Sequence, residues 1–189
     1  MTIELRQGTA ADAHAIHALI TANLHVGHLL PRTFEDVELH ADRFMVAADG
    51  ERVIGCGELA PLSAGVAEVR SLVVDEEWRG QHTGVRLVTA LADRARELGY
   101  VTLCAFTHQP SHFVRLGFSI VPHVWVPEKI AHDCVSCALF RQCGQYAVSL
   151  ALRAGAGLRL DQAAQPTRAV APPRASVERL ALSTERISA

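Results

Sequence analysis

The six residues from Arg79 to Gly84, Arg-Gly-Gln-His-Thr-Gly, could bind a phosphate or a pyrophosphate. They combine a cation with a glycine-containing turn at the start of a helix. Such a turn exposes the backbone N–H groups that the first helical turn leaves unpaired, and the helix dipole adds positive charge in front of them. An ordinary turn between a strand and a helix has the same spacing, so the flanking residues must decide.

The segments on either side of this loop predict a strand and a helix. The apolar residues within Val69–Val74 are typical of a strand in a covered sheet. From Val85 onward apolar residues recur at helical spacing, and Gly99 is typical of a helix end. The predicted strand therefore delivers the chain to the loop, and the predicted helix begins there.

The remaining pattern predicts an α/β (α+β) fold with a central mixed β-sheet and helices on both faces. Further strands are expected at 3–6, 43–48, 53–59, 100–106, 118–122 and 145–152, and further helices at 9–24, 34–41 and 111–116. These elements fill one domain, residues 1–152. Residues 153–189 lack aromatic side chains and are rich in alanine, arginine and proline, which predicts a disordered tail.

The composition excludes several classes of protein. The chain has 189 residues, of which 49% are hydrophobic and 20% charged, and its formal net charge is -2. This balance gives no general attraction to nucleic acid or to an anionic membrane. The first residues lack a secretory pattern, and no apolar run approaches the roughly 18 residues that span a bilayer. We therefore expect a cytoplasmic protein with no nucleic-acid or membrane partner.

The loop and its flanks resemble the acetyl-CoA pyrophosphate loop of the GNAT N-acetyltransferases. The family pattern is Arg or Gln, two residues, Gly, one residue, then Gly or Ala, and His82 stands where the middle glycine is expected. The segment 113–118, Phe-Val-Arg-Leu-Gly-Phe, is similar to the short helix that closes the fold over the pantetheine arm. The resemblance implies acetyl-CoA as co-substrate. The residues it implies in cofactor binding are Leu72, Val73, Val74, Arg79, Gly80, Gln81, His82, Thr83, Gly84, Val85 and Phe113.

Many members of the family have a tyrosine at the position of Phe113, which protonates the departing thiolate. Phenylalanine cannot donate a proton, so Phe113 is expected to be a core aromatic residue beneath the cofactor. Water, Ser111 and His112 remain open as alternative donors.

Several further segments resemble the acetyltransferase domain of N-acetylglutamate synthase, in particular its short stand-alone type. They are 29–33, 55–57, 68–72, 107–110 and 127–130, followed by Asp133, Cys134, Cys137 and Cys143. The resemblance implies transfer of an acetyl group to the α-amine of L-glutamate, the first step of arginine biosynthesis. It also makes a homodimer an expectation of the family.

Two arginines and one glutamate in these segments are the expected substrate-binding and catalytic residues. Arg32 and Arg70 could bind the carboxylates of the substrate, because a guanidinium binds a carboxylate through two hydrogen bonds. Glu68 is the expected base that takes the ammonium proton, and Glu58 is its rival. Each of these side chains could instead serve only in a salt bridge or at a polar strand end.

The five cysteines predict free thiols or a metal site. Cys56 and Cys104 lie in apolar strand patterns and are expected to be small core residues. Cys134, Cys137 and Cys143 have the spacing of three thiolate ligands, to which His123 or His132 could add a fourth. Free thiols near the substrate are the alternative, and we predict no metal.

Two other functions remain open. A GNAT enzyme could acetylate another amine, although the two arginines argue against polyamines because like charges repel. A non-catalytic acyl-CoA-binding module would also account for the departures from the family pattern at His82 and Phe113.

Overall fold

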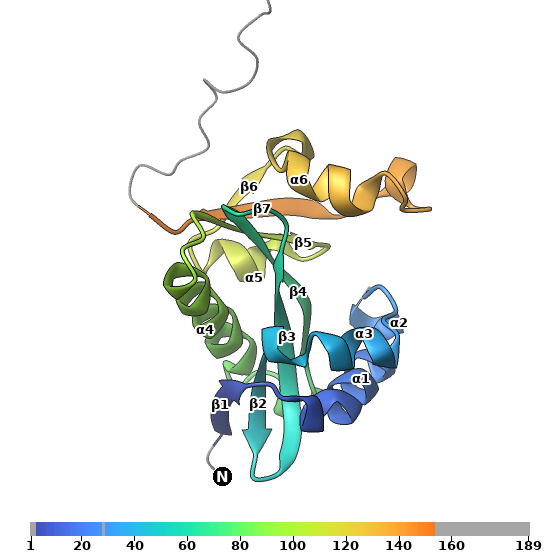
Figure 1. The fold of residues 1–189 in the computed structure, drawn as a ribbon, viewed down its shortest axis with the longest axis vertical. Helices are drawn as coiled ribbons and strands as arrows, with labels where there is room; N and C mark the ends of the chain where they lie inside the picture. Colours follow the sequence, from blue (N-terminus) through green and yellow to red (C-terminus); the bar gives the residue numbers. More distant parts are fainter. Residues whose placement is uncertain (1–2, 28, 154–189) are drawn as a thin grey trace, which may run out of the picture. The chain divides into compact units, whose positions relative to one another are not determined.

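The computed structural model describes residues 3–27 and 29–153, and within them seven strands form one mixed sheet. The order across the sheet is β1-β2-β3-β4-β5-β7-β6 (Figure 1). Only β4 and β5 are parallel neighbours among these strands. The strands are β1 (Ile3–Gln7), β2 (Phe44–Asp49), β3 (Arg52–Pro61), β4 (Val66–Val74), β5 (Thr102–Thr107), β6 (Ser119–Val121) and β7 (Tyr146–Ala151). The predicted mixed sheet is confirmed.

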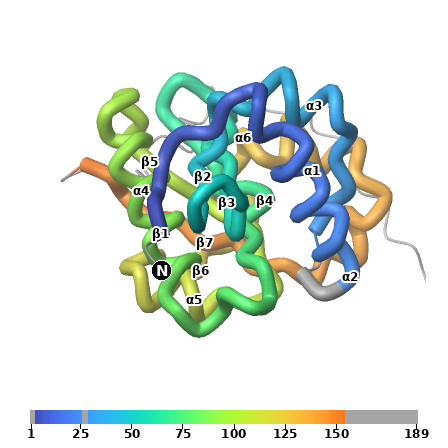
Figure 2. Tube along the Cα trace, turned by 90° about the horizontal axis from the view of Figure 1, so that it is seen from below, coloured from blue at the N-terminus to red at the C-terminus, as the bar shows by residue number. Residues whose placement is uncertain are grey.

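Helices cover both faces of this sheet, as predicted (Figure 2). The α-helices are α1 (Ala13–Ala22), α2 (Leu24–Gly27), α3 (Phe34–Leu39), α4 (Thr83–Glu97), α5 (Pro110–Val114) and α6 (Pro127–Lys129). Short 3₁₀ helices are η1 (Ala10–Asp12), η2 (Ala41–Arg43), η3 (Glu76–Trp78), η4 (His123–Trp125) and η6 (Phe140–Gln142), and η5 (Ile130–Cys134) is a π-helical turn.

The two faces have separate apolar cores. On one face Ile16 and Ile20 of α1 pack with Cys56 and Val73 of the sheet. On the other face α4 and α5 pack together, and this core contains Leu59, Val69, Leu91, Ala95, Leu103 and Phe113. Because strand side chains alternate between faces, β3 and β4 contribute to both cores.

The predicted helix at 9–24 is divided into three shorter elements. Thr9 is the N-cap of η1, where its backbone N–H and its hydroxyl both donate 2.8 Å hydrogen bonds to Asp12 Oδ2. Arg6 pairs with the same carboxylate at 2.7 Å. The pKa of Asp12 is far below its usual value, chiefly because of the hydrogen bond from Arg6. The predicted capping residue is therefore found, although the helix is interrupted.

A bulge interrupts the pairing of β3 with β4. Cys56 lies opposite Val73 and Glu58 opposite Arg70, so β4 contains one extra residue at this point. Ser71 takes up the extra length with a φ of +47°, in the left-handed region that residues other than glycine rarely adopt. Because of the bulge, Val73 and Arg70 both face the side covered by α1 and α3.

Beyond the bulge β4 separates from β5. The parallel pairing joins Val66–Val69 to 102–105 and goes no further. Five residues of β4 follow, and those of them that pair within the sheet pair only with β3. Their other backbone edge is consequently left for a different partner.

All described residues lie in one compact unit, Met1–Leu158. The predicted tail at 153–189 lies outside the described residues apart from Arg153. Among the residues that the structure describes, no helix combines the length and the apolar character needed to cross a membrane.

Candidate active site

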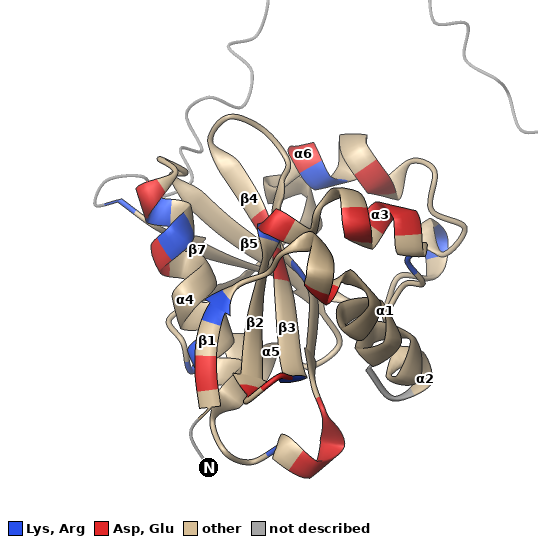
Figure 3. Cartoon of the chain, turned by 60° about the horizontal axis from the view of Figure 1, so that its bottom comes forward, with Lys and Arg blue, Asp and Glu red and all other residues tan. Residues whose placement is uncertain are grey.

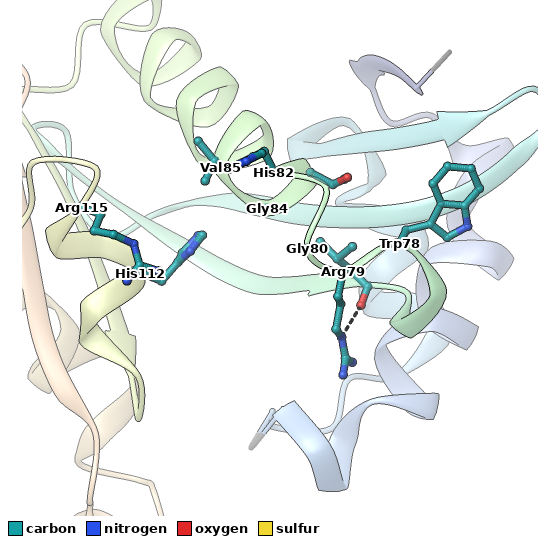
Figure 4. Close-up of a pocket in the computed structure, with 10 residues that line it drawn as sticks. Trp78, Arg79, Gly80, His82, Gly84, Val85, His112 and Arg115 are labelled. Carbon is teal, nitrogen blue, oxygen red and sulfur yellow. Dashed lines mark hydrogen bonds between the residues drawn. The ribbon is translucent and has the colours of Figure 1, made fainter. Parts of the chain in front are cut away.

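The Arg79–Gly84 loop lines a cavity of about 340 Å³ between the N-terminus of α4 and helix α5 (Figure 4). We call this cavity the loop pocket. Its lining residues are Val74, Trp78, Arg79, Gly80, His82, Thr83, Gly84, Val85, His112 and Arg115. Seven of the eleven residues expected to bind the cofactor are therefore in one place.

The N-terminus of α4 is open toward the loop pocket. The N-cap residue His82 makes no side-chain capping bond, so the first backbone N–H groups of the helix are not satisfied by a cap. The hydroxyl oxygen of Thr83 is buried and has no hydrogen-bond partner among the described residues. A 15-residue helix that presents free N–H groups and a buried hydroxyl is suited to binding a phosphate oxygen.

His82 occupies a backbone conformation that favours glycine. Its φ is +60° and its ψ 10°, and Gly80 in the same turn has a φ of +78°. The family pattern has glycine at the position of His82, which agrees with this geometry. The His82 side chain is exposed, so the substitution has a conformational cost and leaves the loop able to form.

Arg79 fixes the loop to two other parts of the molecule. Its Nε donates to Val74 O at 3.1 Å (Figure 4). Its Nη2 donates to Asn23 Oδ1 at 2.7 Å. Asn23 follows α1 and is itself held by a 2.8 Å bond to Leu19 O. Arg79 therefore positions the end of β4 as well as supplying positive charge.

The opposite wall of the loop pocket comes from α5. His112 and Arg115 both face the cavity in Figure 4. Burial, and secondarily the charge of Arg115, lower the pKa of His112, so its ring is neutral at pH 7. Arg115 is exposed and adds a second guanidinium to the pocket.

The free edge of β4 leads away from the loop pocket. Asp75 N–H donates to Ile54 O of β3 at 2.8 Å. Because backbone groups alternate in direction along a strand, the N–H and C=O of Val74 point away from β3, toward the side where β5 has separated. The C=O accepts the hydrogen bond from Arg79 Nε, so it is the N–H that is left to pair with a ligand. An extended ligand arm could pair with this edge as a further strand would.

A second cavity, of about 360 Å³, lies on the face covered by α3 and α6. We call it the charged pocket, and Figure 3 shows acidic residues on both of these helices. Its lining residues are Arg32, Asp36, His40, Arg43, Glu58, Ala60, Pro61, Arg70 and His132. The strand register places Glu58 between Phe44 and Arg70, so that the two expected arginines and Glu58 meet in one cavity.

Arg32 is held by two carboxylates. Its Nη1 donates to Glu58 Oε2 at 2.7 Å, and its Nε pairs with Asp36. Burial lowers the pKa of Arg32, but the hydrogen bond and charge of Glu58 outweigh that effect and the net pKa is raised. Burial raises the pKa of Asp36, yet the hydrogen bond from Arg32 leaves it below its usual value. Arg32 also contacts the bulge, because Nη1 lies 3.4 Å from Ser71 Oγ.

Arg70 belongs to a separate four-residue network. Its Nε donates to Glu68 Oε2 at 2.7 Å and its Nη2 pairs with Asp133. Lys129 binds Glu68 Oε1 at 2.8 Å and Asp133 Oδ2 at 2.8 Å. Burial raises the pKa of Asp133, but the hydrogen bonds from Lys129 and His132 and the charge of Arg70 hold it below its usual value.

The two candidate bases have different surroundings. Both are almost fully buried, with exposed fractions of 2% for Glu68 and 1% for Glu58. Both oxygens of Glu68 are bound by cations, and Glu68 does not line the charged pocket. Glu58 does line the pocket, and the structure records a hydrogen bond only to its Oε2 among the described residues. Glu58 is therefore better placed than Glu68 to accept a proton from a bound ligand.

The remaining expected cofactor residues lie outside both pockets. Val73 is buried against α1, and Leu72 packs on the α4 side. Gln81 is exposed in the loop. Phe113 is buried against Phe118, with ring centroids 5.2 Å apart, as expected of a core aromatic residue.

The cysteines form no metal site among the residues described. The structure brings no cluster of three or more His, Cys, Asp or Glu side chains into ligand geometry, although Cys134, Cys137 and Cys143 are all described and free. Burial raises the pKa of Cys56 to about 12 and also raises the pKa of Cys104. These two thiols remain protonated core residues, as expected.

Sequence reasoning did not find every pocket residue. Arg43 and His132 line the charged pocket, and Trp78 and Arg115 line the loop pocket. Arg115 could have been found, because it lies inside the 113–118 segment that resembles the family. No signal marked Arg43, which begins the predicted strand at 43–48 like any polar residue at an element boundary.

Comparison with protein families gives one match that spans more than half of the chain. The family described as "Acetyltransferase (GNAT) family" matches residues 13–118. An uncharacterized N-acetyltransferase of Chlorobaculum tepidum is 31% identical over 144 residues, which cover 76% of this chain and 93% of that protein.

Two further relatives carry more specific names. An amino-acid acetyltransferase of Shewanella oneidensis is 32% identical over 127 residues, 66% of this chain and 28% of that protein. The crystal structure of N-acetylglutamate synthase from Neisseria gonorrhoeae, complexed with coenzyme A and N-acetyl-glutamate, has a TM-score of 0.72 and 25% identity. That match covers 81% of this chain and 36% of the synthase, so this chain spans about a third of these longer relatives.

Proposed function

This chain belongs to the acetyltransferase (GNAT) family, and from that premise we propose that it acetylates the α-amine of L-glutamate. It is an N-acetyltransferase that uses acetyl-CoA as co-substrate. We choose glutamate as the acceptor because Arg32, Arg70 and Glu58 all line the charged pocket. Glutamate has two carboxylates for the cations and one ammonium group for the carboxylate.

The two pockets suggest how acetyl-CoA would lie. The loop pocket would hold the pyrophosphate through the N–H groups of α4, the hydroxyl of Thr83 and the guanidinium of Arg115. The pantetheine arm would pair with the free edge of β4, from Val74 to the bulge at Ser71. Three strand residues span about 10 Å, which brings the thioester to the charged pocket.

Acetyl transfer then needs a neutral amine beside the thioester. The amine nitrogen forms a bond to the carbonyl carbon, the carbon–sulfur bond breaks, and the CoA thiolate leaves. The nitrogen then loses one further proton to give the amide, which balances the proton that the thiolate takes up to become the thiol. The ammonium proton goes to a carboxylate, for which the contacts support Glu58 over Glu68. Arg32 and Arg70 each keep one terminal nitrogen without a recorded hydrogen bond among the described residues, so each can still donate to the acceptor.

The two carboxylates can be separated by kinetics. We expect Glu58→Gln to lower kcat by about 100-fold or more, because general base catalysis contributes about 10²- to 10⁴-fold. Glu68→Gln should raise the KM for glutamate through the loss of Arg70 positioning, with a smaller effect on kcat. A pH–rate profile that keeps its acidic limb in Glu58→Gln and loses it in Glu68→Gln would reverse the assignment.

The proposed reaction is tested by measuring thiol release from acetyl-CoA with glutamate, aspartate, glutamine, ornithine and spermidine as acceptors. Glutamate-dependent release that is lost in Arg70→Ala supports the proposal. Arg96→Ala is the matched control, since Arg96 on the surface of α4 pairs with Asp93 alone within the part of the chain that the structure describes. Turnover of another amine in place of glutamate would show that the acceptor is that amine. Acetyl-CoA binding without turnover of any amine would indicate a binding module.

A further inference from the structure

The cations of the charged pocket are not equally available to a ligand. A guanidinium binds a carboxylate most strongly through two adjacent nitrogens. In Arg32, Nε and Nη1 are already bound to Asp36 and Glu58, which leaves only Nη2. In Arg70, Nε and Nη2 are bound to Glu68 and Asp133, which leaves only Nη1. Neither of the two expected arginines therefore keeps two adjacent nitrogens that are both free of a protein carboxylate.

Lys129 is also fully engaged. Its ammonium contacts both oxygens of Glu68 and one oxygen of Asp133, at 2.8 to 2.9 Å. An ammonium has three donors, so these contacts use all of them. The four-residue network around Arg70 therefore has two cations and two carboxylates and no net charge to offer.

Arg43 differs from these three cations. It lines the charged pocket and is half-buried, yet no ion pair or side-chain hydrogen bond is recorded for it within residues 3–27 and 29–153. Its backbone N–H donates to His40 O at 2.9 Å, which fixes the last residue of η2 at the pocket rim. Its whole guanidinium therefore remains available to a ligand.

The position of Arg43 along the sheet indicates which part of a ligand it would meet. Phe44 lies opposite Glu58, so Arg43 lies one residue further along β3, away from the bulge at Ser71. Ala60 and Pro61 line the pocket on the same side. The amine must lie near Glu58 and the thioester, so Arg43 would meet the end of the acceptor that is remote from the amine.

We infer that Arg43 is the specificity-determining residue that binds the side-chain carboxylate of the acceptor through two hydrogen bonds. This inference rests on the proposed glutamate acetyltransferase activity and deepens it. It assigns Arg32 and Arg70 mainly to holding Glu58, Glu68 and Asp133, with one unbound terminal nitrogen each left for the acceptor. Glutamine has the same shape without the charge, so discrimination between glutamate and glutamine should depend on Arg43.

The experiment compares kcat and KM for glutamate and for glutamine in the wild type, Arg43→Gln and Arg43→Lys. We expect Arg43→Gln to raise the KM for glutamate by about 10- to 100-fold, the effect of losing charge-assisted hydrogen bonds. The KM for glutamine and the KM for acetyl-CoA should not change. Arg43→Lys should give an intermediate KM for glutamate, because it restores the charge without the paired donors.

Each other outcome has a definite meaning. An equal rise in KM for both acceptors would overturn the inference, because it would indicate general damage to the pocket. An unchanged KM for glutamate in Arg43→Gln would overturn it while leaving the proposed reaction intact. No glutamate turnover by the wild type would overturn the proposed reaction and this inference together. Arg96→Gln, on the surface of α4, controls for loss of a positive charge.

Discussion

At the scale of single residues, removal of the buried hydroxyl of Thr83 should have different effects on the stability of the protein and on its affinity for acetyl-CoA. Its exposed fraction is 1%, and its Oγ1 has no partner among the described residues. An unsatisfied buried donor costs about 1–3 kcal/mol, so Thr83→Val should leave the unliganded protein as stable as the wild type or more stable. If the hydroxyl binds a phosphate, the same change should weaken acetyl-CoA binding by about 10-fold or more.

Urea unfolding without ligand and calorimetric titration with acetyl-CoA measure these two effects. Thr83→Ser is the matched control, since it keeps the hydroxyl and removes a methyl group. Unchanged acetyl-CoA affinity in Thr83→Val would show that the hydroxyl does not contact the cofactor.

His112 provides a pH-dependent contribution to stability. Burial lowers the pKa of His112 in the folded protein, so the folded state resists protonation. The folded protein keeps its full stability at a pH above the pKa that His112 has in the unfolded chain, about 6.5. Part of that stability is lost as the pH falls from there through the lower pKa of His112 in the folded protein. Between pH 7.5 and pH 5 the free energy of unfolding should therefore fall more in the wild type than in His112→Gln. Equal losses in the two proteins, measured by urea unfolding, would contradict the shift.

Residue types in the charged pocket were predictable, but their pairing was not. The sequence identifies Arg32, Arg70 and Glu68 because they lie in segments with a family resemblance, and Glu58 because it lies near the end of the preceding predicted strand. It does not show which carboxylate pairs with which arginine, since that depends on the bulge at Ser71. The sequence also does not show that the Arg43 side chain has no recorded ion pair or hydrogen bond among the described residues. That feature depends on how the pocket is assembled, and no local sequence pattern indicates it.

At the scale of elements, Gly8 controls how closely β1 approaches η2. A Cβ at Gly8 would lie 2.7 Å from Ala41 O, a backbone atom that cannot turn away, and 3.3 Å from Phe44 Cβ. Overpacking of this kind usually costs about 1–3 kcal/mol, so Gly8→Ala should lower the free energy of unfolding by that amount. It should also raise the KM for the acceptor, because Arg43 ends η2.

Gly65→Ala is the matched control for this prediction. A Cβ at Gly65 would meet the side-chain atom Val101 Cγ2 at 3.3 Å, and a side chain can adjust. We expect a change of about 0.5 kcal/mol or less, as at other sites away from the core. Equal destabilisation of the two variants in chemical denaturation would show that the contact of Gly8 with Ala41 is not special.

The elements with strong periodicity were predictable, and the irregular ones were not. Residues 69–74 and 85–98 carry clear strand and helix patterns, and the structure places β4 and α4 there. The helical segment 127–134 was not predicted, because α6 and η5 are too short to show a period and Pro127 only marks their start. The bulge was also unforeseen, since its left-handed residue is Ser71 and not glycine.

At the scale of the whole molecule, β7 completes the sheet. It lies between β5 and β6, pairing Ala151 with Thr102 and Ser149 with Ser119. Directly after it, Leu152 N–H donates to Val101 O at 2.9 Å, and Leu152 is 8% exposed. Every strand of the predicted domain at 1–152 thus has its neighbours before the chain reaches residue 154.

This arrangement predicts that the chain can be shortened to end at Arg153 without loss of folding or activity. We expect the melting temperature to stay within about 2 °C of the full chain and kcat/KM to remain unchanged. A chain that ends at Gln145 lacks β7 and leaves β5 and β6 without their shared partner, so it should fail to fold. A lower melting temperature in the chain ending at Arg153 would place the domain boundary further along, whereas lost turnover with unchanged melting would assign the removed residues a part in catalysis.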